Sequence, residues 1–160
     1  MRLRKKAAMD IGVISDTHGL MRAEALVALS GSRLILHAGD IGSASVLDAL
    51  GAIAPVVAIR GNCDRGPWAQ ELPDVEVVEA GAHLIYLLHD LHMLDLDPAA
   101  AGFQVVISGH SHKPAQQEQE GVLYVNPGSA GPRRFKLPVT VARLRLDPTH
   151  VGVEIIELSL

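Results

Sequence analysis

The stretch IGVISDTHG at residues 11–19 sets polar and ionisable side chains directly after a short apolar run. The run Ile11–Ile14 is typical of a buried strand, because it is short, apolar and followed by turn-forming residues. A stretch of helical periodicity at Arg22–Leu29 and a second apolar run at Leu34–His37 come next. This order predicts a strand, a helix and a second strand, with the ionisable residues of the quoted stretch at the end of the first strand.

The same alternation continues along the chain and predicts parallel strands with right-handed crossovers in the first half. The second half is mostly strand, with hairpins. The expected helices cover Arg22–Leu29 and Ser45–Leu50, and the expected strands cover Ile11–Ile14, Leu34–His37, Val56–Ile59, Val75–Glu79, Leu84–Leu88, Val105–Ile107, Val122–Val125, Val139–Leu146 and Val151–Leu158. We therefore expect one α/β domain over residues 1–160, with two packed mixed sheets and helices outside them.

The composition excludes some classes of protein. Apolar residues make up 48% of the 160 residues, so the chain can bury a core and is not disordered. Aromatic residues make up only 3% and the formal charge is −4, which argues against general nucleic-acid binding by stacking or by a basic surplus. No run reaches the roughly 18 apolar residues of a membrane span, so we expect no membrane partner.

The single cysteine, Cys63, allows no internal disulfide bond and indicates a reducing compartment. We therefore expect a cytoplasmic protein. The basic residues near the start, Arg2, Arg4, Lys5 and Lys6, are expected to form a solvated tail, because no apolar signal segment follows them.

Each of five expected strands ends beside side chains that can bind a metal. These side chains are Asp16, His18, Asp40, Asn62, His89, His110 and His112. In open α/β sheets ligands bind outside the carboxyl ends of the strands, so the donors converge if the five strands lie side by side. Asp16 and His18 are two residues apart, and in an extended segment such residues point the same way. The sequence therefore predicts a metal site at this end of the sheet.

Seven donors are too many for one metal ion with an open position, and they suit two ions. Carboxylate, amide and imidazole groups fit Mn, Fe, Zn, Ni or Co better than a metal that prefers thiolates. Of these we expect Mn. Two such ions about 3.5–4 Å apart form a known clamp for phosphoryl chemistry.

Five motifs follow one another in the chain: Asp16-Thr17-His18, Gly39-Asp40, Gly61-Asn62-Cys63-Asp64, the single His89, and Gly109-His110-Ser111-His112. In this order they resemble the calcineurin-like metallophosphoesterase superfamily, whose pattern is D-x-H, G-D, G-N-H-D/E, a lone His and G-H-x-H. The G-N-C-D variant and the segment Asn126-Pro127-Gly128-Ser129 resemble the small prokaryotic-type phosphodiesterase branch of that superfamily.

The resemblance implies a two-sheet β-sandwich flanked by helices, in a four-layer αββα arrangement. It also implies hydrolysis of a phosphate ester by a hydroxide that bridges two divalent metal ions, with Asp40 and Asn62 as catalytic residues. The implied ligands are Asp16, His18 and His112 for one ion, Asn62, His89 and His110 for the other, and Asp40 as the bridge between them.

Two positions depart from the superfamily pattern, namely Cys63 and Asp90, where many relatives have Gly after the lone His. Cys63 stands where relatives commonly have a His that helps to protonate the leaving group. A thiol is a poor match for that role, so we expect weaker activity on esters with poor leaving groups. We interpret Cys63 first as a small buried filler, ahead of a spare ligand or a reactive thiol. Asp64 is expected to orient a ligand.

Several histidines and basic residues have two interpretations. His92 competes with His89 for the lone-His role, but strand-end placement favours His89. His37 is expected to pack or to hydrogen-bond near the site rather than to bind metal. The basic residues Arg133, Arg134 and Lys136 are expected in a solvated loop, with a contact to a substrate phosphate as the alternative.

The function expected first is a phosphodiesterase that acts on a small phosphate ester. The alternatives are a phosphomonoesterase with the same site, and a metal-poor protein-interaction scaffold of the retromer-subunit type. The complete set of donors disfavours the scaffold. The apolar edges of the C-terminal strands could pair to form a homodimer.

Overall fold

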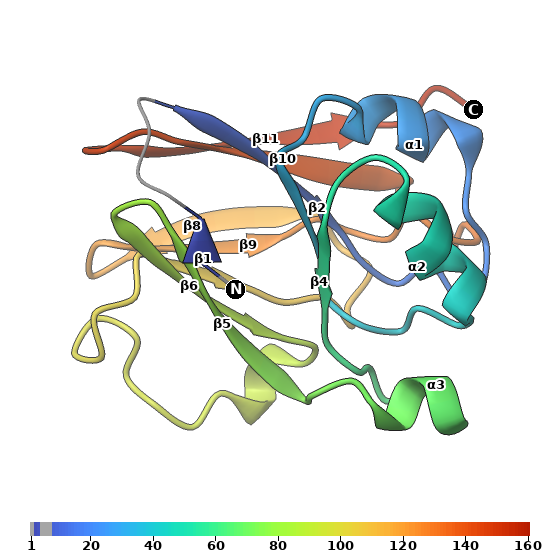
Figure 1. Cartoon of the computed structure of the whole chain (residues 1–160), viewed down its shortest axis with the longest axis horizontal. Helices are drawn as coiled ribbons and strands as arrows, with labels where there is room; N and C mark the ends of the chain where they lie inside the picture. Colours follow the sequence, from blue (N-terminus) through green and yellow to red (C-terminus); the bar gives the residue numbers. More distant parts are fainter. Residues whose placement is uncertain (1, 4–7) are drawn as a thin grey trace.

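The computed structural model describes residues 2–3 and 8–160, with side chains from residue 8 onward (Figure 1). The strands are β1 (Arg2–Leu3), β2 (Met9–Ile14), β3 (Leu34–His37), β4 (Val56–Ala58), β5 (Val75–Ala80), β6 (His83–Leu88), β7 (Val105–Ile107), β8 (Ala115–Gln119), β9 (Val122–Asn126), β10 (Thr140–Leu146) and β11 (Val151–Glu157). The helices are α1 (Ala23–Leu29), α2 (Ala44–Gly51), α3 (Pro67–Gln70) and the 3-10 turn η1 (Leu91–Met93). Of the predicted basic tail, Arg4, Lys5 and Lys6 lie outside the described residues, whereas the backbone of Arg2 pairs with β5.

The described strands form two mixed sheets. One has the order β1-β5-β6-β7-β9-β8 and the other the order β11-β10-β2-β3-β4. Strands β2, β3 and β4 are parallel neighbours, which confirms the alternation predicted for the first half. The predicted hairpins are also present, since β5 pairs antiparallel with β6 and β10 with β11. The predicted fold class is therefore confirmed.

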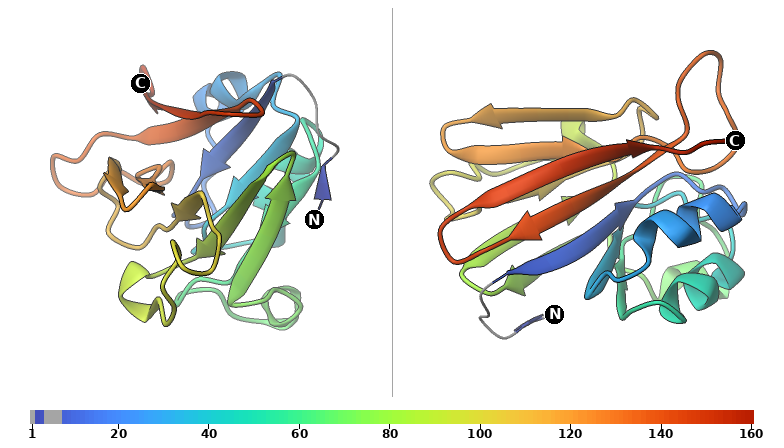
Figure 2. Two further views of the ribbon diagram at one scale, coloured as in Figure 1. Left: turned by 90° about the vertical axis from the view of Figure 1, so that its left-hand side faces the viewer. Right: turned by 90° about the horizontal axis from the view of Figure 1, so that it is seen from above.

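The strands that carry the candidate donors do not all lie side by side in one sheet, as the sequence interpretation assumed. Strands β2, β3 and β4 belong to the five-stranded sheet, whereas β6 and β7 belong to the other. The two sheets pack face to face, and the loops after these strands meet at one end of the sandwich (Figures 1 and 2). The donors thus converge across two sheets.

The main core lies between the sheets. Alternate residues of β2, such as Ile11 and Val13, pack there against Ile85 and Leu87 of β6, because successive side chains of a strand point to opposite faces. Ile14 of β2 faces the other way and joins the core under the helices. Strands buried on both faces read as continuous apolar runs, which is why β2 and β3 were easy to predict.

The outer faces are covered unequally. Helices α1 and α2 pack on the five-stranded sheet through residues such as Leu29 and Leu50. The outer face of the six-stranded sheet is covered by the segment 91–104, where Phe103 meets Tyr86 edge to face at 5.2 Å between ring centroids. In the described residues this outer layer holds only η1 and turns. Proline at position 98 and several aspartates keep the segment from forming a longer helix.

Two elements had no clear sequence signal. Strand β8 is exposed along its whole length and reads AQQEQ, so it lacks the apolar alternation that marks a strand. It forms because the turn at Glu120 and Gly121, both with positive φ, folds it back onto β9. Helix α3 is a single turn. None of the helices among residues 2–3 and 8–160 is both long enough and apolar enough to cross a membrane.

Candidate metal centre

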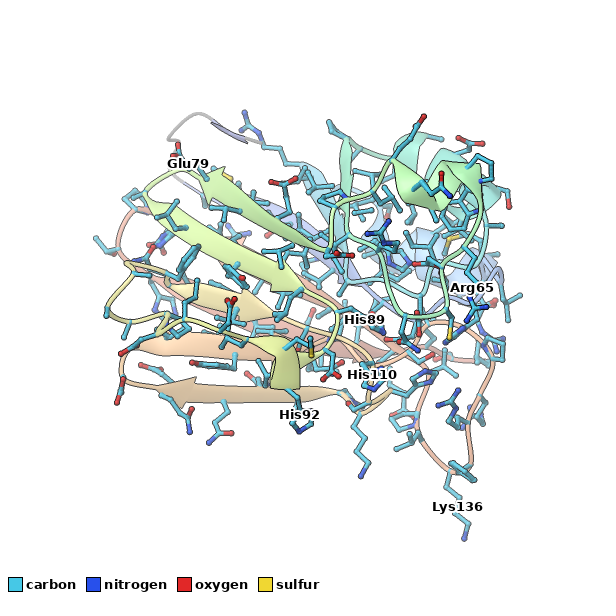
Figure 3. All side chains as sticks on the ribbon, turned by 90° about the horizontal axis from the view of Figure 1, so that it is seen from below. Arg65, Glu79, His89, His92, His110 and Lys136 are labelled. Carbon is cyan, nitrogen blue, oxygen red and sulfur yellow. The ribbon has the colours of Figure 1, made fainter. Side chains whose placement is uncertain are left out.

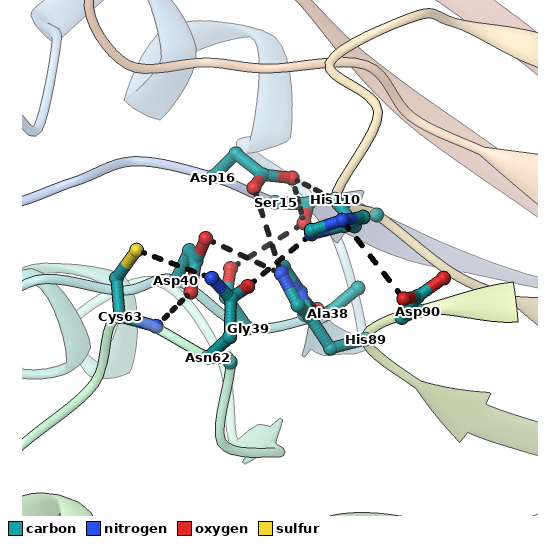
Figure 4. Close-up of polar contacts among 12 residues, drawn as sticks. Ser15, Asp16, Ala38, Gly39, Asp40, Asn62, Cys63, His89, Asp90 and His110 are labelled. Atoms are coloured by element: carbon teal, nitrogen blue, oxygen red, sulfur yellow. Dashed lines mark hydrogen bonds and ion pairs between the residues drawn. The ribbon is translucent and has the colours of Figure 1, made fainter. Parts of the chain in front are cut away.

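The seven predicted donors lie on the loops that follow β2, β3, β4, β6 and β7. Figure 3 labels His89 and His110 on the ribbon, and Figure 4 shows these two close to Asp16, Asp40 and Asn62. Three groups of side chains have ligand atoms that lie within 4.8 Å of one another, and one of them, made of His18, Asp40 and Cys63, shares a residue with each of the other two. The first group is Asp16, His18 and His112, and the second is Asp40, His89 and His110. Asn62 lies beside the second group, where its side chain contacts His110.

The first group lies around Asp16 Oδ1. This oxygen is 3.4 Å from His112 Nε2 and 3.8 Å from His18 Nε2, and the two imidazole nitrogens are 3.3 Å apart. The other carboxylate oxygen, Asp16 Oδ2, accepts hydrogen bonds from the Ser15 hydroxyl at 2.6 Å and from the His110 amide at 3.0 Å. The carboxylate is therefore held by one oxygen and directs the other toward the two histidines.

The second group lies around Asp40 Oδ2, which is 3.3 Å from His89 Nε2. His89 Nδ1 donates to the carbonyl of Ala38 at 2.7 Å, so in the neutral ring Nε2 carries the lone pair and faces the carboxylate. His110 Nδ1 is 3.2 Å from Asn62 Oδ1. On the other side of that ring, His110 Nε2 lies 3.9 Å from Asp90 Oδ2 (Figure 4).

Asp40 stands between the two groups. Its Oδ2 is also 3.8 Å from His18 Nε2, which belongs to the first group. Its Oδ1 accepts a hydrogen bond from the Cys63 amide at 2.8 Å. A carboxylate in this position can face both groups at once.

The donors do not sit in extended backbone, as the spacing argument assumed. Left-handed backbone occurs at five of the predicted ligands, namely Asp16 (φ 55°), His18 (φ 47°), Asp40 (φ 54°), His110 (φ 71°) and His112 (φ 63°). Asp and His tolerate this region better than most residues, but it remains uncommon and gathers at functional sites. Tight turns, rather than strand alternation, therefore aim these side chains at the site.

The glycines of the motifs leave room for the carboxylates. A Cβ on Gly61 would overlap Asp40, and a Cβ on Gly109 would overlap Ser15 and lie 2.7 Å from Asp16 Oδ2. Any side chain at these two positions would push the carboxylate away from its histidines. This explains why glycine precedes Asn62 and His110 in the sequence.

Asp64, which the sequence analysis expected to orient a ligand, holds two loops together. It is buried, and its carboxylate accepts hydrogen bonds from the amides of Gly42 at 2.9 Å, Ile41 at 3.2 Å and Gly61 at 2.9 Å. It thereby ties the loop that carries Asp40 to the loop that carries Asn62. Its contacts are with backbone, not with the ligand side chains themselves.

Three residues that position the site were given no role by the sequence interpretation. The Ser15 hydroxyl holds Asp16 Oδ2, and the Ser129 hydroxyl donates to the Asp16 carbonyl at 2.9 Å. The Asn126 amide donates to the Gly109 carbonyl at 2.9 Å and to the Ser111 hydroxyl at 3.1 Å. Asn126 and Ser129 flank the Pro-Gly turn of the N-P-G-S segment, so the signal for them was that turn and the family it resembles.

His37 lies behind the site, as predicted. It is fully buried, accepts a hydrogen bond from the Gly39 amide at 3.1 Å and lies 3.0 Å from the Thr17 hydroxyl. Burial, and then the charge of His89, lower the pKa of His37 to about 3, so the ring is neutral. His92 is 95% exposed and pairs with Asp90 at 3.1 Å, which leaves the strand-end position to His89.

Burial and neighbouring groups shift the pKa values of three ionisable residues at the site. Burial opposes ionisation of Asp40, but the close approach of the His89 ring and the hydrogen bond from the Cys63 amide outweigh burial and hold the pKa of Asp40 at about 2. Burial lowers the pKa of His89, but the nearby Asp40 carboxylate and the hydrogen bond to the Ala38 carbonyl outweigh burial and raise that pKa. Burial lowers the pKa of His112, and the positive charge of Arg134 adds to this effect against the opposing charge of Asp16.

Cys63 is not the buried filler that the sequence interpretation placed first. Its side chain is exposed, because residues 61–64 form a turn at the mouth of the site rather than part of the core. The Asn62 amide donates to Cys63 Sγ at 3.4 Å. Partial burial and the charge of Asp40 raise the pKa of the thiol, so it is protonated at neutral pH.

The residues present fit a pair of divalent cations. Among the described residues, Asp16 Oδ1 and His89 Nε2 are buried and have no hydrogen-bond partner. Buried polar atoms are rarely left unpaired, and here an acidic oxygen and an imidazole nitrogen face the same space. The donor types, oxygen and imidazole nitrogen, suit the borderline divalent metals.

A pocket of about 620 Å³ opens beside the second group. It reaches Asn62, His89 and His110 on one side. On the other side it is lined by Arg65 and by the apolar side chains of Val75 and Met93. A substrate held at the donors would have room for one of its arms here.

The chain is similar to known proteins over nearly its whole length. The calcineurin-like phosphoesterase superfamily domain matches residues 9–149. A probable metallophosphoesterase of Methanothermobacter thermautotrophicus is 37% identical, over 92% of both chains. Phosphodiesterase YfcE of Escherichia coli K12 is 27% identical, over 89% of this chain and 91% of its own.

The fold also occurs in a protein whose name does not mention phosphoesterase activity. The crystal structure of Chaetomium thermophilum Vps29 superimposes with a TM-score of 0.77 at 20% identity, over 94% of this chain and 98% of its own. At that identity the likeness concerns the fold alone. The family match and the sequence relatives go further, and the chain belongs to the calcineurin-like phosphoesterase superfamily.

Proposed function

We propose that the chain is a phosphodiesterase that uses two divalent metal ions to hydrolyse a small phosphate ester. The observation that carries the proposal is the pair of donor groups, in which the buried atoms Asp16 Oδ1 and His89 Nε2 have no hydrogen-bond partner among the described residues. The relatives named metallophosphoesterase and phosphodiesterase support the same activity.

We assign one ion to Asp16, His18 and His112, and the other to Asn62, His89 and His110. Asp40 lies between the groups, and its distances of 3.3 Å to His89 Nε2 and 3.8 Å to His18 Nε2 fit the role of a bridge. When bound, such ions polarise phosphoryl oxygens and lower the pKa of water toward neutrality. Mn is the ion we propose, with Ni, Fe, Zn and Co as the other candidates for this donor set.

Side chains at the site are placed to orient the ester. Asn62 lies at the mouth of the site, beside the pocket, where its amide can donate to a phosphoryl oxygen. His110 lines the same pocket, and its backbone amide donates a hydrogen bond to Asp16 Oδ2 that positions the residue. Cys63 occupies the position from which a superfamily His would protonate the leaving group, so leaving groups that depart without a proton are favoured.

The domain organisation, the cellular location and the partners of the protein are also proposals. We propose a single domain over residues 1–160, a cytoplasmic location in keeping with the exposed free thiol of Cys63, and no general binding of nucleic acid. Strand β11 lies at the edge of its sheet, and pairing of two such edges would give a homodimer, which light scattering would detect.

The test is an assay with controlled metal content. The purified protein is analysed for bound metal and assayed on bis(p-nitrophenyl) phosphate and on p-nitrophenyl phosphate, before and after chelation and with Mn added back. We expect chelation to abolish turnover, Mn to restore it, and the diester to be preferred. Preference for the monoester would make the chain a phosphomonoesterase. Absence of bound metal and of turnover would favour the scaffold instead.

A further inference from the structure

A second hollow lies beside the metal centre and is lined by cations. Its volume is about 720 Å³, and it is lined by Ser111, Lys113, Arg134, Phe135, Lys136 and Leu137. Ser111 separates His110 from His112, so the hollow begins where the first donor group ends. It is distinct from the pocket beside Asn62 and His89, which shares none of these residues.

The basic side chains that line this hollow have no acidic partner among the described residues. The lining includes three cations and no carboxylate, in a chain whose formal charge is −4. Among residues 8–160, no hydrogen bond or ion pair engages the side chains of Lys113, Arg134 or Lys136. A cluster of unpaired cations repels itself and is most stable when an anion binds between its members.

An aromatic ring stands at the rim. Phe135 is 89% exposed and has a φ of 54°, a conformation that bulky residues rarely adopt. The turn is closed by the Leu137 amide, which donates to the Arg134 carbonyl at 3.1 Å. The turn therefore presents the Phe135 ring to solvent beside two cations. An exposed aromatic ring can stack on a nucleotide base, and the neighbouring cations can pair with a phosphate.

The loop that carries these residues is fixed to the metal centre. The Ser129 hydroxyl donates to the Asp16 carbonyl at 2.9 Å, and the Arg22 guanidinium donates to the Gly131 carbonyl at 3.2 Å. In Figure 3, Lys136 lies at the tip of this loop, which projects from the end of the sandwich where His110 lies. The hollow therefore has a set position relative to the donors.

We propose that this hollow, around Lys113, Arg134, Phe135 and Lys136, binds the far arm of the substrate, and that this arm carries an aromatic base and a second phosphate. The inference rests on the proposed function, because it places the ester to be cleaved at the metal centre. It names the substrate class as a phosphorylated short nucleotide diester, such as a dinucleotide with a terminal phosphate. The basic loop thus contacts substrate rather than solvent alone.

The test compares two dinucleotides, ApA and 5′-phosphorylated ApA, with methyl p-nitrophenyl phosphate as a diester that has no far arm. We expect the Mn-loaded wild type to prefer the phosphorylated dinucleotide by about tenfold in kcat/KM, or about 1.4 kcal/mol. The variant Lys136→Ala is expected to lose most of that preference and to keep its activity on methyl p-nitrophenyl phosphate. Phe135→Ala is expected to lower kcat/KM on both dinucleotides.

Arg133→Ala is the matched control, because Arg133 lies in the same loop and carries the same charge but does not line the hollow. Equal loss of the preference in Arg133→Ala and in Lys136→Ala would overturn the proposal, as would equal wild-type kcat/KM on the two dinucleotides. If the wild type cleaves none of the three diesters, the proposed function fails. Calorimetric titration with the two dinucleotides then tests the hollow, and equal affinity for both would refute it.

Discussion

Replacing Asp64 with asparagine tests whether the two central loops are held by one buried carboxylate. The carboxylate accepts from the amides of Gly42, Ile41 and Gly61 at 2.9, 3.2 and 2.9 Å. Asparagine keeps one acceptor oxygen and turns an NH₂ group toward at least one of these donors. The change removes one or two charge-assisted bonds worth about 1.5–3 kcal/mol each, so we expect a loss of about 2–4 kcal/mol.

The assays are thermal unfolding of the metal-free protein and calorimetric titration with Mn. For a domain of this size the loss corresponds to a fall in Tm of roughly 5–15 °C. Because the loops carry Asp40 and Asn62, the affinity for Mn is expected to fall by about 10–100-fold. Asp48→Asn, on the exposed face of α2, is the control and is expected to change neither quantity. An Asp64→Asn protein with the Tm and Mn affinity of the control would refute the account of the loops.

Three further predictions follow from the site. Burial keeps the pKa of His37 at about 3 instead of 6.5, so between these pH values the unfolded chain binds a proton that the folded chain does not. The free energy of unfolding, measured with urea, is therefore expected to fall as pH drops from 7 to 4.5. The fall is expected to be about 2 kcal/mol larger than in His37→Gln, and equal losses in the two proteins would contradict the buried neutral ring. Gly61→Ala places a Cβ against Asp40 and is expected to abolish Mn binding in calorimetry, whereas Gly51→Ala, whose Cβ meets nothing within 4 Å, is expected to bind normally; normal binding by both would show that the close approach is unimportant. Cys63→His supplies a proton donor at the mouth of the site and is expected to raise kcat at least about tenfold on diesters with alkyl leaving groups but not on p-nitrophenyl esters; a uniform change on both would count against a missing general acid.

Several strands were predictable because they are buried on both faces. Runs such as Leu34–His37 and Val105–Ile107 are apolar throughout, and the structure places β3 and β7 at these same residues. Strand β8 was not predictable, because its exposed polar residues carry no periodicity and its pairing with β9 alone defines it. The thin outer layer over the six-stranded sheet was also unforeseen, since a covering loop leaves no helical pattern.

The donors of the site were visible in the sequence, but the geometry that unites them was not. Motif order singled out Asp16 and His112, whereas the route by which they meet depends on left-handed turns and on two facing sheets. The exposure of Cys63 and the hydrogen bonds of Asn126 and Ser129 depend on the same loops. Contacts between segments about 100 residues apart cannot be deduced from local pattern.

The measurement that tests the central claim most directly is anomalous X-ray scattering from crystals of the Mn-loaded protein. The account predicts two Mn peaks, one bounded by Asp16, His18 and His112 and the other by Asn62, His89 and His110, with Asp40 touching both. A single peak, or peaks away from these side chains, would contradict the assignment of the two-metal centre.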